Sequence, residues 1–267
     1  MAGFISKGEV AVSVIIVNFR TLAFTVEAID SAIAEPEARE IIVVDNHSAD
    51  GSAETLATMY AGNDRVQIIP QPKNGGFGAG NNVGSRSASE KYLFLLNSDA
   101  TLTPGCLSAL LKHRAQTGIV GISAPVVRVT GTGEVQKDAV GIFPFAARIV
   151  TRRTRRTIPP ERAEWVSGCA MLIDLEIFNR IGGFDEEIFM YLEDVLLCWE
   201  VTNLGGQITY CPDATVEHRG GKSEVPSLSK KAQYFRSQDL LLTKFGEPLI
   251  LRLAVQAIRR VTRLVKL

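Results

Sequence analysis

The sequence has few cysteines, and none are paired at the spacing of a metal or redox site. Its four cysteines are scattered without a C-x-x-C motif (Cys106, Cys169, Cys198 and Cys211). A disulfide framework and a zinc site are therefore not expected, and a reducing compartment is the default. The sequence also lacks an apolar segment within residues 1–9 and any apolar run of about 18 residues. We therefore expect a cytoplasmic protein with neither a signal peptide nor a membrane-spanning helix.

Net charge is also lacking, because 29 Lys and Arg residues balance 29 Asp and Glu residues. The basic residues nevertheless gather in two segments without acids. Segment 146–160 holds Arg148, Arg152, Arg153, Arg155 and Arg156, and segment 249–267 holds Arg252, Arg259, Arg260, Arg263 and Lys266. Neither segment is interleaved with aromatic residues, so nucleic-acid binding is not favoured. The first segment fits either a clamp for phosphates or anionic headgroups, or a solvated loop.

Apolar residues alternate with basic ones in the last segment, which predicts a C-terminal helix over 248–266. Such a helix fits either a membrane-surface helix or a helix docked on the core. The first interpretation would give peripheral contact with the inner face of the plasma membrane. Both interpretations remain open from the sequence.

Apolar, β-branched runs alternate with helical patterns in the first half of the chain. Strands are expected at 12–17, 40–44, 66–69, 92–96 and 119–122, with helices at 21–34, 53–61 and 104–116 and another after the glycine-rich segment 73–82. This order predicts an α/β fold with a mostly parallel central sheet flanked by helices. Ligands of such sheets bind at the carboxyl ends of the strands.

The second half is less regular. We expect a hairpin at 126–137, a connection over 141–160, and strands at 165–173, 207–210 and 215–217. Helices are expected at 175–181, 193–203 and 229–245, before the C-terminal helix.

Polar residues follow several of the expected strands. Asp45 and Asn46 follow the second strand, where a carboxylate can accept hydrogen bonds from a nucleobase or a ribose, or form an Asx turn. Asp99 follows the fourth strand, where it can hold a hard cation against two phosphates, or cap a turn. Its placement at the end of a buried strand favours the functional interpretation.

A glycine-rich segment contains Gly75, Gly76, Gly78 and Gly80, which would let the backbone approach a pyrophosphate or form a flexible turn. It does not match G-x-G-x-x-G, because Asn81 occupies the third glycine position. The segment 221–223 ends like a phosphate-binding loop, but Val216 occupies the position of its first glycine.

Two adjacent carboxylates, Glu193 and Asp194, stand at the expected start of a helix. The positive end of a helix dipole favours negative charge there, and a cleft enzyme would keep a general base in such a place. His218, one of only three histidines, follows downstream and suits a neutral ligand of a cation.

At these residues the chain resembles the inverting family 2 glycosyltransferases of GT-A fold, most closely their bacterial branch of rhamnosyltransferases and galactofuranosyltransferases. The matching segments extend in the family's order over residues 12–245. They are 14–19 (VIIVNF), 41–52 (IIVVDNHSADGS), 74–82 (NGGFGAGNN), 95–99 (LLNSD), 168–173 (GCAMLI), 182–186 (GGFDE), 189–194 (FMYLED) and 218–223 (HRGGKS).

The resemblance implies a role for each matching residue. Asp194 would be the general base, with Glu193 shaping the site, and Asp45 would read the base of the donor nucleotide. Asp99 and His218 would hold Mn²⁺ or Mg²⁺ on the diphosphate. The remaining residues implied to line the nucleotide-sugar site are Asn18, Asn74, Gly75, Gly76 and Asn97.

Two positions depart from the family pattern. Asn97 replaces the first acid of the usual Asp-x-Asp metal motif, as in the rhamnosyltransferase-like branch. Leu196 stands where a further acid often occurs, which leaves Asp194 as the base that the resemblance implies.

We therefore expect one GT-A domain over 1–246, with a nucleotide-binding half at about 10–123, an acceptor and catalytic half at about 124–246, and a basic C-terminal helix at 247–267. The expected activity is inverting, metal-assisted transfer from a nucleoside-diphosphate sugar, dTDP-L-rhamnose first, to a hydroxyl of a cell-envelope glycan or lipid-linked acceptor. The alternatives are a UDP-sugar donor (hexose or galactofuranose), a nucleotidyltransferase, and a non-catalytic sugar-nucleotide-binding module. A nucleotidyltransferase is disfavoured, because Asn18-Phe19-Arg20 stands where its glycine-rich basic signature belongs.

Overall fold

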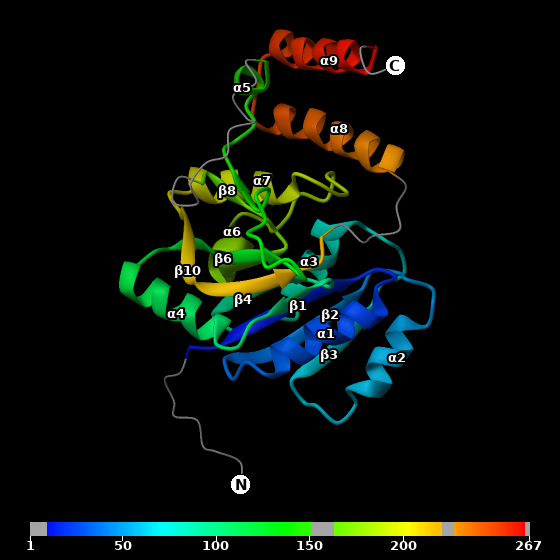
Figure 1. The fold of residues 1–267 in the computed structure, drawn as a ribbon, viewed down its shortest axis with the longest axis vertical. Coiled ribbons are helices and arrows are strands. Elements are labelled where there is room, and N and C mark those ends of the chain that lie inside the picture. The colour runs from blue at the N-terminus through cyan, green and yellow to red at the C-terminus, as the bar shows by residue number, and fades with distance from the viewer. Residues whose placement is uncertain (1–9, 151–162, 221–226, 265–267) are drawn as a thin grey trace.

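The computed structural model describes residues 10–150, 163–220 and 227–264 (Figure 1). The first half contains β1 (Val12–Asn18), α1 (Leu22–Ile33), β2 (Ala38–Asp45), α2 (Ser52–Met59), β3 (Val66–Pro70), α3 (Phe77–Ser85), β4 (Tyr92–Asn97), β5 (Ala100–Leu102), α4 (Cys106–Thr117) and β6 (Gly121–Val129). The second half contains β7 (Val140–Gly141), α5 (Ala146–Val150), β8 (Trp165–Val166), β9 (Ala170–Asp174), α6 (Leu175–Arg180), α7 (Glu193–Asn203), β10 (Gln207–His218), α8 (Ser227–Lys244) and α9 (Leu249–Leu264).

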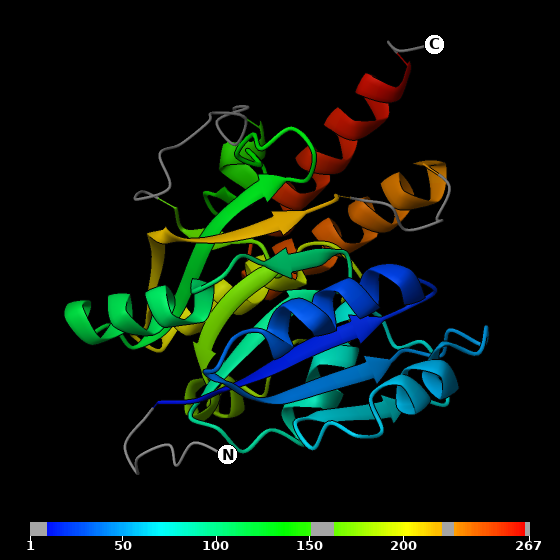
Figure 2. The ribbon, with the colours of Figure 1, turned by 60° about the horizontal axis from the view of Figure 1, so that its bottom comes forward.

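The central sheet has the order β3-β2-β1-β4-β9-β6-β10-β5. Strands β1 to β4, β6 and β10 run parallel, while β9 and β5 run antiparallel to their neighbours. Figure 2 shows that the sheet curls strongly, so that β10 and β5 lie over one end of it. The predicted mostly parallel α/β sheet is confirmed. Its parallel strands β1, β2 and β4 end at one edge, as the residue pairs Asn18–Asp45 and Val17–Asn97 show.

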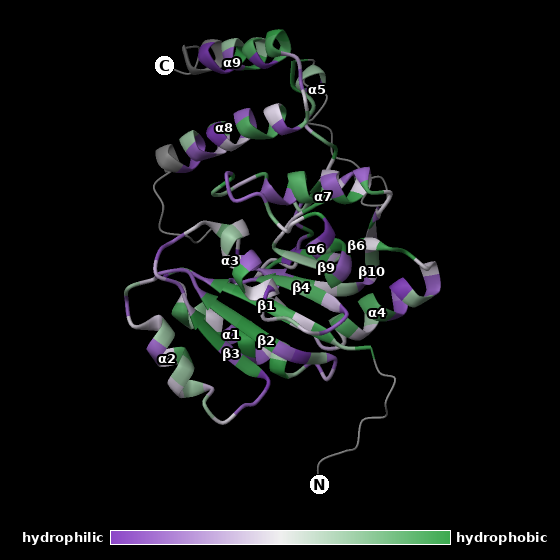
Figure 3. Cartoon of the chain, turned by 180° about the vertical axis from the view of Figure 1, so that it is seen from behind, coloured by the Kyte–Doolittle hydropathy of each residue, from purple (hydrophilic) through white to green (hydrophobic). Residues whose placement is uncertain are grey.

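Helices cover both faces of the sheet because successive strand residues point to opposite sides. In β1, Val14 and Ile16 belong to one buried cluster with residues of α1, α2 and α4. Ile15 belongs to a second cluster with residues of α6 and α7. The strands β1, β2 and β4 are accordingly hydrophobic over most of their length (Figure 3). The polar ends of these strands are therefore held by a rigid core on both sides.

The C-terminal helices form further layers beyond α7, first α8 and then α9 (Figure 1). Leu241 of α8 joins the cluster of α7, while Leu242 packs with Val255 of α9 and Ala146 of α5. The predicted C-terminal helix therefore forms, and one of its faces docks on the protein. Among the helices within the described residues, none is long and apolar enough to cross a membrane.

Several sequence predictions of single elements were wrong. The strand predicted at 119–122 and the first half of the hairpin predicted at 126–137 are one strand, β6, and the pieces predicted at 207–210 and 215–217 are one bulged strand, β10. The strand predicted at 165–173 is interrupted between β8 and β9. The short elements β5, β7 and α5 were not predicted.

Candidate active site

The end of β1 meets the end of β2 through Asn18 and Asp45, which are both buried. Asn18 Nδ2 donates to Asp45 Oδ1 at 2.6 Å, and Ser48 donates to the same carboxylate from its hydroxyl at 2.6 Å and from its backbone N–H at 3.1 Å. Asp45 therefore stabilises the turn after β2, as its Asx-turn interpretation expects. A carboxylate offers about four lone-pair sites, so Asp45 retains the capacity to accept from a ligand.

The glycine-rich segment is tied to the same edge by Asn46. Its side-chain nitrogen donates to Asn74 Oδ1 at 3.0 Å and to the Gly76 carbonyl at 2.9 Å, and its Oδ1 accepts from the Gly75 N–H at 3.2 Å. Asn74 Oδ1 also accepts from the Gly76 N–H at 2.9 Å. The structure thus brings Asp45, Asn74, Gly75 and Gly76 to one place.

Gly76 touches the segment that precedes the two carboxylates. A Cβ at Gly76 would lie 2.0 Å from the Phe189 carbonyl oxygen, and its φ of +93° favours glycine. The Phe77 N–H donates to the same carbonyl at 3.1 Å. Helix α3 begins at Phe77, so part of the predicted glycine-rich loop is helical. Gly76 has no side chain, and this allows the close contact between two distant parts of the chain.

Asp99 and His218, the cation ligands that the resemblance implies, lie side by side. His218 Nε2 lies 3.1 Å from Asp99 Oδ1 and 3.4 Å from Asn97 Nδ2, and His218 Nδ1 lies 2.8 Å from Gln136 Oε1. In the neutral imidazole, an acceptor at Nδ1 favours the tautomer with the proton on that nitrogen, whose Nε2 lone pair is on the side of Asp99. A carboxylate oxygen and an imidazole nitrogen are ligands that divalent cations accept.

Protein side chains alone do not complete this cation site. Within the three described ranges, no group of three or more His, Cys, Asp or Glu side chains could hold a metal ion. Two protein ligands suit a cation that is also held by phosphate oxygens of a substrate. The donor set therefore fits Mn²⁺ or Mg²⁺ on a diphosphate better than a permanent structural metal.

The carboxylate pair opens α7, at the helix terminus that the sequence predicted. Asp194 Oδ2 accepts from the Gly168 N–H at 2.9 Å, and Oδ1 accepts from the Val195 N–H at 2.8 Å. Asp194 is half-buried, whereas Glu193 is 7% exposed. Among the described residues, Glu193 Oε2 has no hydrogen-bond partner. Asp194 is therefore the more accessible of the two carboxylates.

Burial changes the acidity of both groups. It raises the pKa of Glu193 well above its usual range, and the neighbouring Asp194 charge adds to this rise. Burial also raises the pKa of Asp194, against the lowering effect of the hydrogen bonds from Gly168 and Val195. A carboxylate with a raised pKa is a better proton acceptor than an ordinary aspartate.

Residues 168 and 169 connect the carboxylate pair to the cation site. Gly168 donates to Asp194, and the next residue, Cys169, accepts the Asn97 N–H through its carbonyl at 2.9 Å. Burial, with smaller contributions from the charges of Asp194 and Asp99, raises the pKa of the Cys169 thiol to about 12. Residues 168 and 169 thus join the start of α7, which carries Asp194, to the end of β4, which precedes Asp99.

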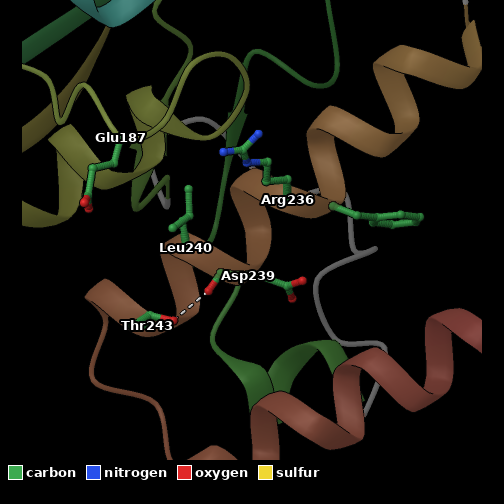
Figure 4. Close-up of a pocket in the computed structure, with 6 residues that line it drawn as sticks. Glu187, Arg236, Asp239, Leu240 and Thr243 are labelled. Carbon is green, nitrogen blue, oxygen red and sulfur yellow. Dashed lines mark hydrogen bonds between the residues drawn. The ribbon is translucent and has the colours of Figure 1, made fainter.

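Other predicted features lie elsewhere. Arg148 pairs with Glu164 at 2.5 Å, while Arg152, Arg153, Arg155 and Arg156 lie outside the described residues, as do residues 221–223. A cavity of about 670 Å³ lies between Glu187 and α8, where it is lined by Phe235, Arg236, Asp239, Leu240 and Thr243 (Figure 4). None of the side chains predicted for the donor or for the base lines it.

Sequence reasoning missed several residues that hold this site together. They are Ser48 beside Asp45, Gln136 beside His218, Gly168 beside Asp194, and Asn82. The Asn82 side chain donates to the Phe184 carbonyl and accepts from the Phe184 N–H, each at 2.8 Å. Ser48, Asn82 and Gly168 stand inside the matching segments, which was an available signal. Gln136 carried no signal, since its partner is 82 residues away.

Comparison with known proteins gives one family. The family model described as Glycosyl transferase family 2 matches residues 13–182, which is more than half of the chain. An N-acetylglucosaminyl-diphospho-decaprenol L-rhamnosyltransferase of Mycobacterium tuberculosis is 28% identical over 68% of this chain and 67% of its own length. Rhamnosyltransferase WbbL of Escherichia coli is 26% identical over 75% of this chain and 80% of its own length.

Solved structures share the fold. GalNAc-T7 with UDP, GalNAc and Mn²⁺ superposes with a TM-score of 0.66 at 17% identity, covering 87% of this chain. The chain spans only 48% of that protein. The mannosyltransferase PcManGT of Pyrobaculum calidifontis, in complex with GDP-Man and Mn²⁺, gives a TM-score of 0.64 at 17% identity, over 94% of this chain and 69% of its own. These likenesses are to proteins of the GT-A fold, so the predicted fold is confirmed.

Proposed function

The chain belongs to glycosyl transferase family 2 and is a glycosyltransferase, and we propose that it is an inverting enzyme that uses a nucleoside-diphosphate sugar and a divalent cation. The observation that carries this proposal is the arrangement around Cys169. There the Gly168 N–H donates to the candidate base, Asp194, and the Cys169 carbonyl accepts the N–H of Asn97, two residues before the candidate cation ligand Asp99. A base that lies next to a diphosphate site suits a single in-line displacement.

The proposed reaction is divided among residues of this chain. The edge formed by Asn18, Asp45, Asn74, Gly75 and Gly76 binds the nucleotide. Asp194 accepts the proton of an acceptor hydroxyl, whose oxygen attacks the anomeric carbon while the nucleoside diphosphate leaves. The acceptor oxygen and the leaving group lie on opposite faces of the sugar, so one displacement inverts the anomeric configuration. The raised pKa of Glu193 lets it keep its proton to a higher pH than an ordinary glutamate does, which limits the negative charge beside Asp194.

Asp99 and His218 would hold Mn²⁺ or Mg²⁺, with Asn97 beside them. When bound, such a cation neutralises negative charge on the leaving diphosphate. The fit rests on the imidazole nitrogen and the carboxylate oxygen that face each other at 3.1 Å. Gln136 would fix the imidazole in the orientation that this role requires.

The proposed donor is dTDP-L-rhamnose, because two relatives in different bacteria carry rhamnosyltransferase names. A UDP-sugar is the second candidate, since UDP occupies one of the structural neighbours. The acceptor is a hydroxyl of a cell-envelope glycan or a lipid-linked glycan. An N-acetylglucosaminyl diphospholipid, which the name of the Mycobacterium relative contains, is the first to test.

Binding of dTDP, UDP and GDP to the purified chain, each with and without Mn²⁺, tests this function. We expect metal-dependent binding with dTDP preferred. A preference for UDP would move the donor to a UDP-sugar on the same site. Binding of none of the three would contradict the proposal and leave a fold without this activity.

We also propose that residues 1–246 act as the GT-A domain and that α9 contacts the membrane surface. In the first turns of α9, Leu249, Ile250 and Leu253 are 62%, 76% and 52% exposed. Segment 249–267 is basic and has no acid, which complements anionic lipids. Its peripheral placement would bring the active site close to a lipid-linked acceptor.

Co-sedimentation with vesicles that contain phosphatidylglycerol tests the membrane contact. The wild type should pellet, and a variant with Leu249, Ile250 and Leu253 all changed to Glu should not. Leu204→Glu, at a residue 43% exposed on the far end of α7, is the matched control. Equal pelleting of the triple variant and the wild type would exclude this role of α9.

A further inference from the structure

The segment 189–192 is fixed between the donor side of the site and α8. On the donor side, the Phe189 carbonyl accepts the Phe77 N–H and touches Gly76. On the other side, Ser237 of α8 donates its hydroxyl hydrogen to the Met190 carbonyl at 2.7 Å. The two carboxylates follow directly in the chain, so this segment separates the nucleotide edge from the face that α8 covers.

The backbone of this segment is strained. Tyr191 and Leu192 are consecutive non-glycine residues, and each has a φ of +69° in the left-handed region. Such a conformation persists only where the surroundings hold it, and it is concentrated at functional sites. Here the contacts at Phe189 and Met190 hold it, and the sharp turn places the Tyr191 side chain toward α8.

The Tyr191 ring meets Tyr234 of α8, with ring centroids 6.3 Å apart and the planes tilted by 55°. Tyr234 is 38% exposed and Tyr191 is half-buried. Within the described ranges, neither tyrosine hydroxyl hydrogen-bonds to another residue. Two partly open rings with free polar tips thus stand beside the active site.

Both rings lie near the carboxylate pair. Burial raises the pKa of Tyr191, and the Glu193 charge contributes to that rise. Burial also raises the pKa of Tyr234, where the Asp194 charge is a further cause and Arg259 acts in the opposite direction. Tyr191 stands two residues before the start of α7 at Glu193, and Tyr234 packs on Tyr191, so both rings lie beside the carboxylate pair.

We propose that Tyr191 and Tyr234 form the binding site for the sugar ring of the acceptor. In an in-line displacement the acceptor approaches Asp194 from the side opposite to the leaving diphosphate. The nucleotide edge lies on the Gly76 side of segment 189–192, and the tyrosines lie on the α8 side. This inference rests on the proposed function, because it assigns the second substrate of the same reaction.

The chemistry of the pair suits a pyranose. A sugar ring has an apolar C–H face, which packs on an aromatic ring, and a rim of hydroxyls, which need hydrogen-bond partners. The two phenol groups supply such partners, and Glu193 Oε2, buried and without a partner in the described part of the chain, supplies another. Asp194 then stands where it can accept the proton of one rim hydroxyl.

Ligand-observed NMR of octyl N-acetylglucosaminide with the full chain, in the presence of dTDP and Mg²⁺, tests the proposal. The sugar-ring protons should receive more saturation from the wild type than the octyl protons do. Tyr234→Ala should weaken the affinity for this probe about tenfold, with the affinity for dTDP unchanged. Tyr234→Phe keeps the ring and loses one hydrogen-bond partner, so its affinity should lie between those of Tyr234→Ala and the wild type.

Tyr60→Ala is the matched control, because Tyr60 ends α2 and hydrogen-bonds Asp30 away from this site. It should bind the probe as the wild type does. Unchanged affinity in Tyr234→Ala, an equal loss in Tyr234→Phe, or no binding of the probe to the wild type at millimolar concentration would each overturn the proposal. Failure of the proposed function is seen separately, as absence of dTDP binding to the wild type.

Discussion

His218 Nε2 lies 3.1 Å from Asp99 Oδ1, although 119 residues of chain separate them. The two residues meet because β10 runs antiparallel to β5, which pairs His218 with Ala100. The Arg219 N–H also donates to the Asp99 carbonyl at 3.0 Å, which fixes the backbone on both sides of the pair. The cation site is therefore built into the sheet, and only the imidazole orientation depends on a loop residue, Gln136.

Gln136→Leu should raise the Mn²⁺ concentration needed for half-maximal dTDP binding about tenfold, because the imidazole loses the partner that fixes its tautomer. The measurement is calorimetric titration of dTDP at several Mn²⁺ concentrations. Gln136→Glu keeps an acceptor for Nδ1 and should restore most of the affinity. Glu134→Leu, at an exposed position in the same turn, is the control. An unchanged Mn²⁺ requirement in Gln136→Leu would remove Gln136 from the site.

Gly76→Ala should destabilise the protein by about 2 kcal/mol or more, because a Cβ would meet backbone rather than a flexible side chain. It should also weaken nucleotide binding, since the Asn46–Asn74 network surrounds Gly76. Gly62→Ala is the matched control, because a Cβ there meets nothing within 4 Å, and it should change stability by less than about 0.5 kcal/mol. Urea unfolding of the two variants checks this prediction, and equal stabilities would contradict it.

Glu193→Gln should stabilise the protein at neutral pH. The pKa of Glu193 is raised in the folded state, so the folded protein keeps a proton that the unfolded chain releases above the ordinary value of 4.5. Folding is therefore opposed increasingly as the pH rises from that value toward the folded pKa. Glutamine does not ionise, and we expect a gain of about 1–2 kcal/mol at pH 7.5 that shrinks toward pH 4.

Thermal unfolding over this pH range checks the sign of the Glu193 effect. Glu217→Gln, at an exposed position in β10, should leave the pH profile as in the wild type. A loss of stability in Glu193→Gln at pH 7.5 would contradict a raised pKa of Glu193 in the folded protein.

Much of the fold could be predicted because it is local in the sequence. The apolar runs of β1, β2 and β4 and the polar residues after them predicted the sheet edge where Asn18, Asp45 and Asp99 lie. The long strand β10 was missed because Pro212 and Asp213 are typical of a turn. The structure instead places them in a bulge, between Cys211 and Thr215.

The break between β8 and β9 was missed for a different reason. Residues 165–173 are apolar enough for one strand, but the chain turns at Gly168 and Cys169, and the Gly168 N–H donates to Asp194. The rule that a run of apolar residues predicts one continuous strand fails here, because the site requires an irregular backbone. Gln136 and Tyr234 could not be found either, since their partners come from distant elements.

The most direct test of the proposed mechanism is Asp194→Asn, assayed for dTDP binding with Mn²⁺ and for rhamnosyl transfer from dTDP-L-rhamnose to an N-acetylglucosaminyl diphospholipid. The amide keeps the shape of the carboxylate and its place beside Gly168, but it cannot accept the proton. We expect dTDP affinity as in the wild type and transfer reduced by about 10²–10⁴-fold. Asp64→Asn, at an exposed residue, should behave as the wild type in both assays. Transfer by Asp194→Asn at the wild-type rate would contradict the assignment of Asp194 as the base.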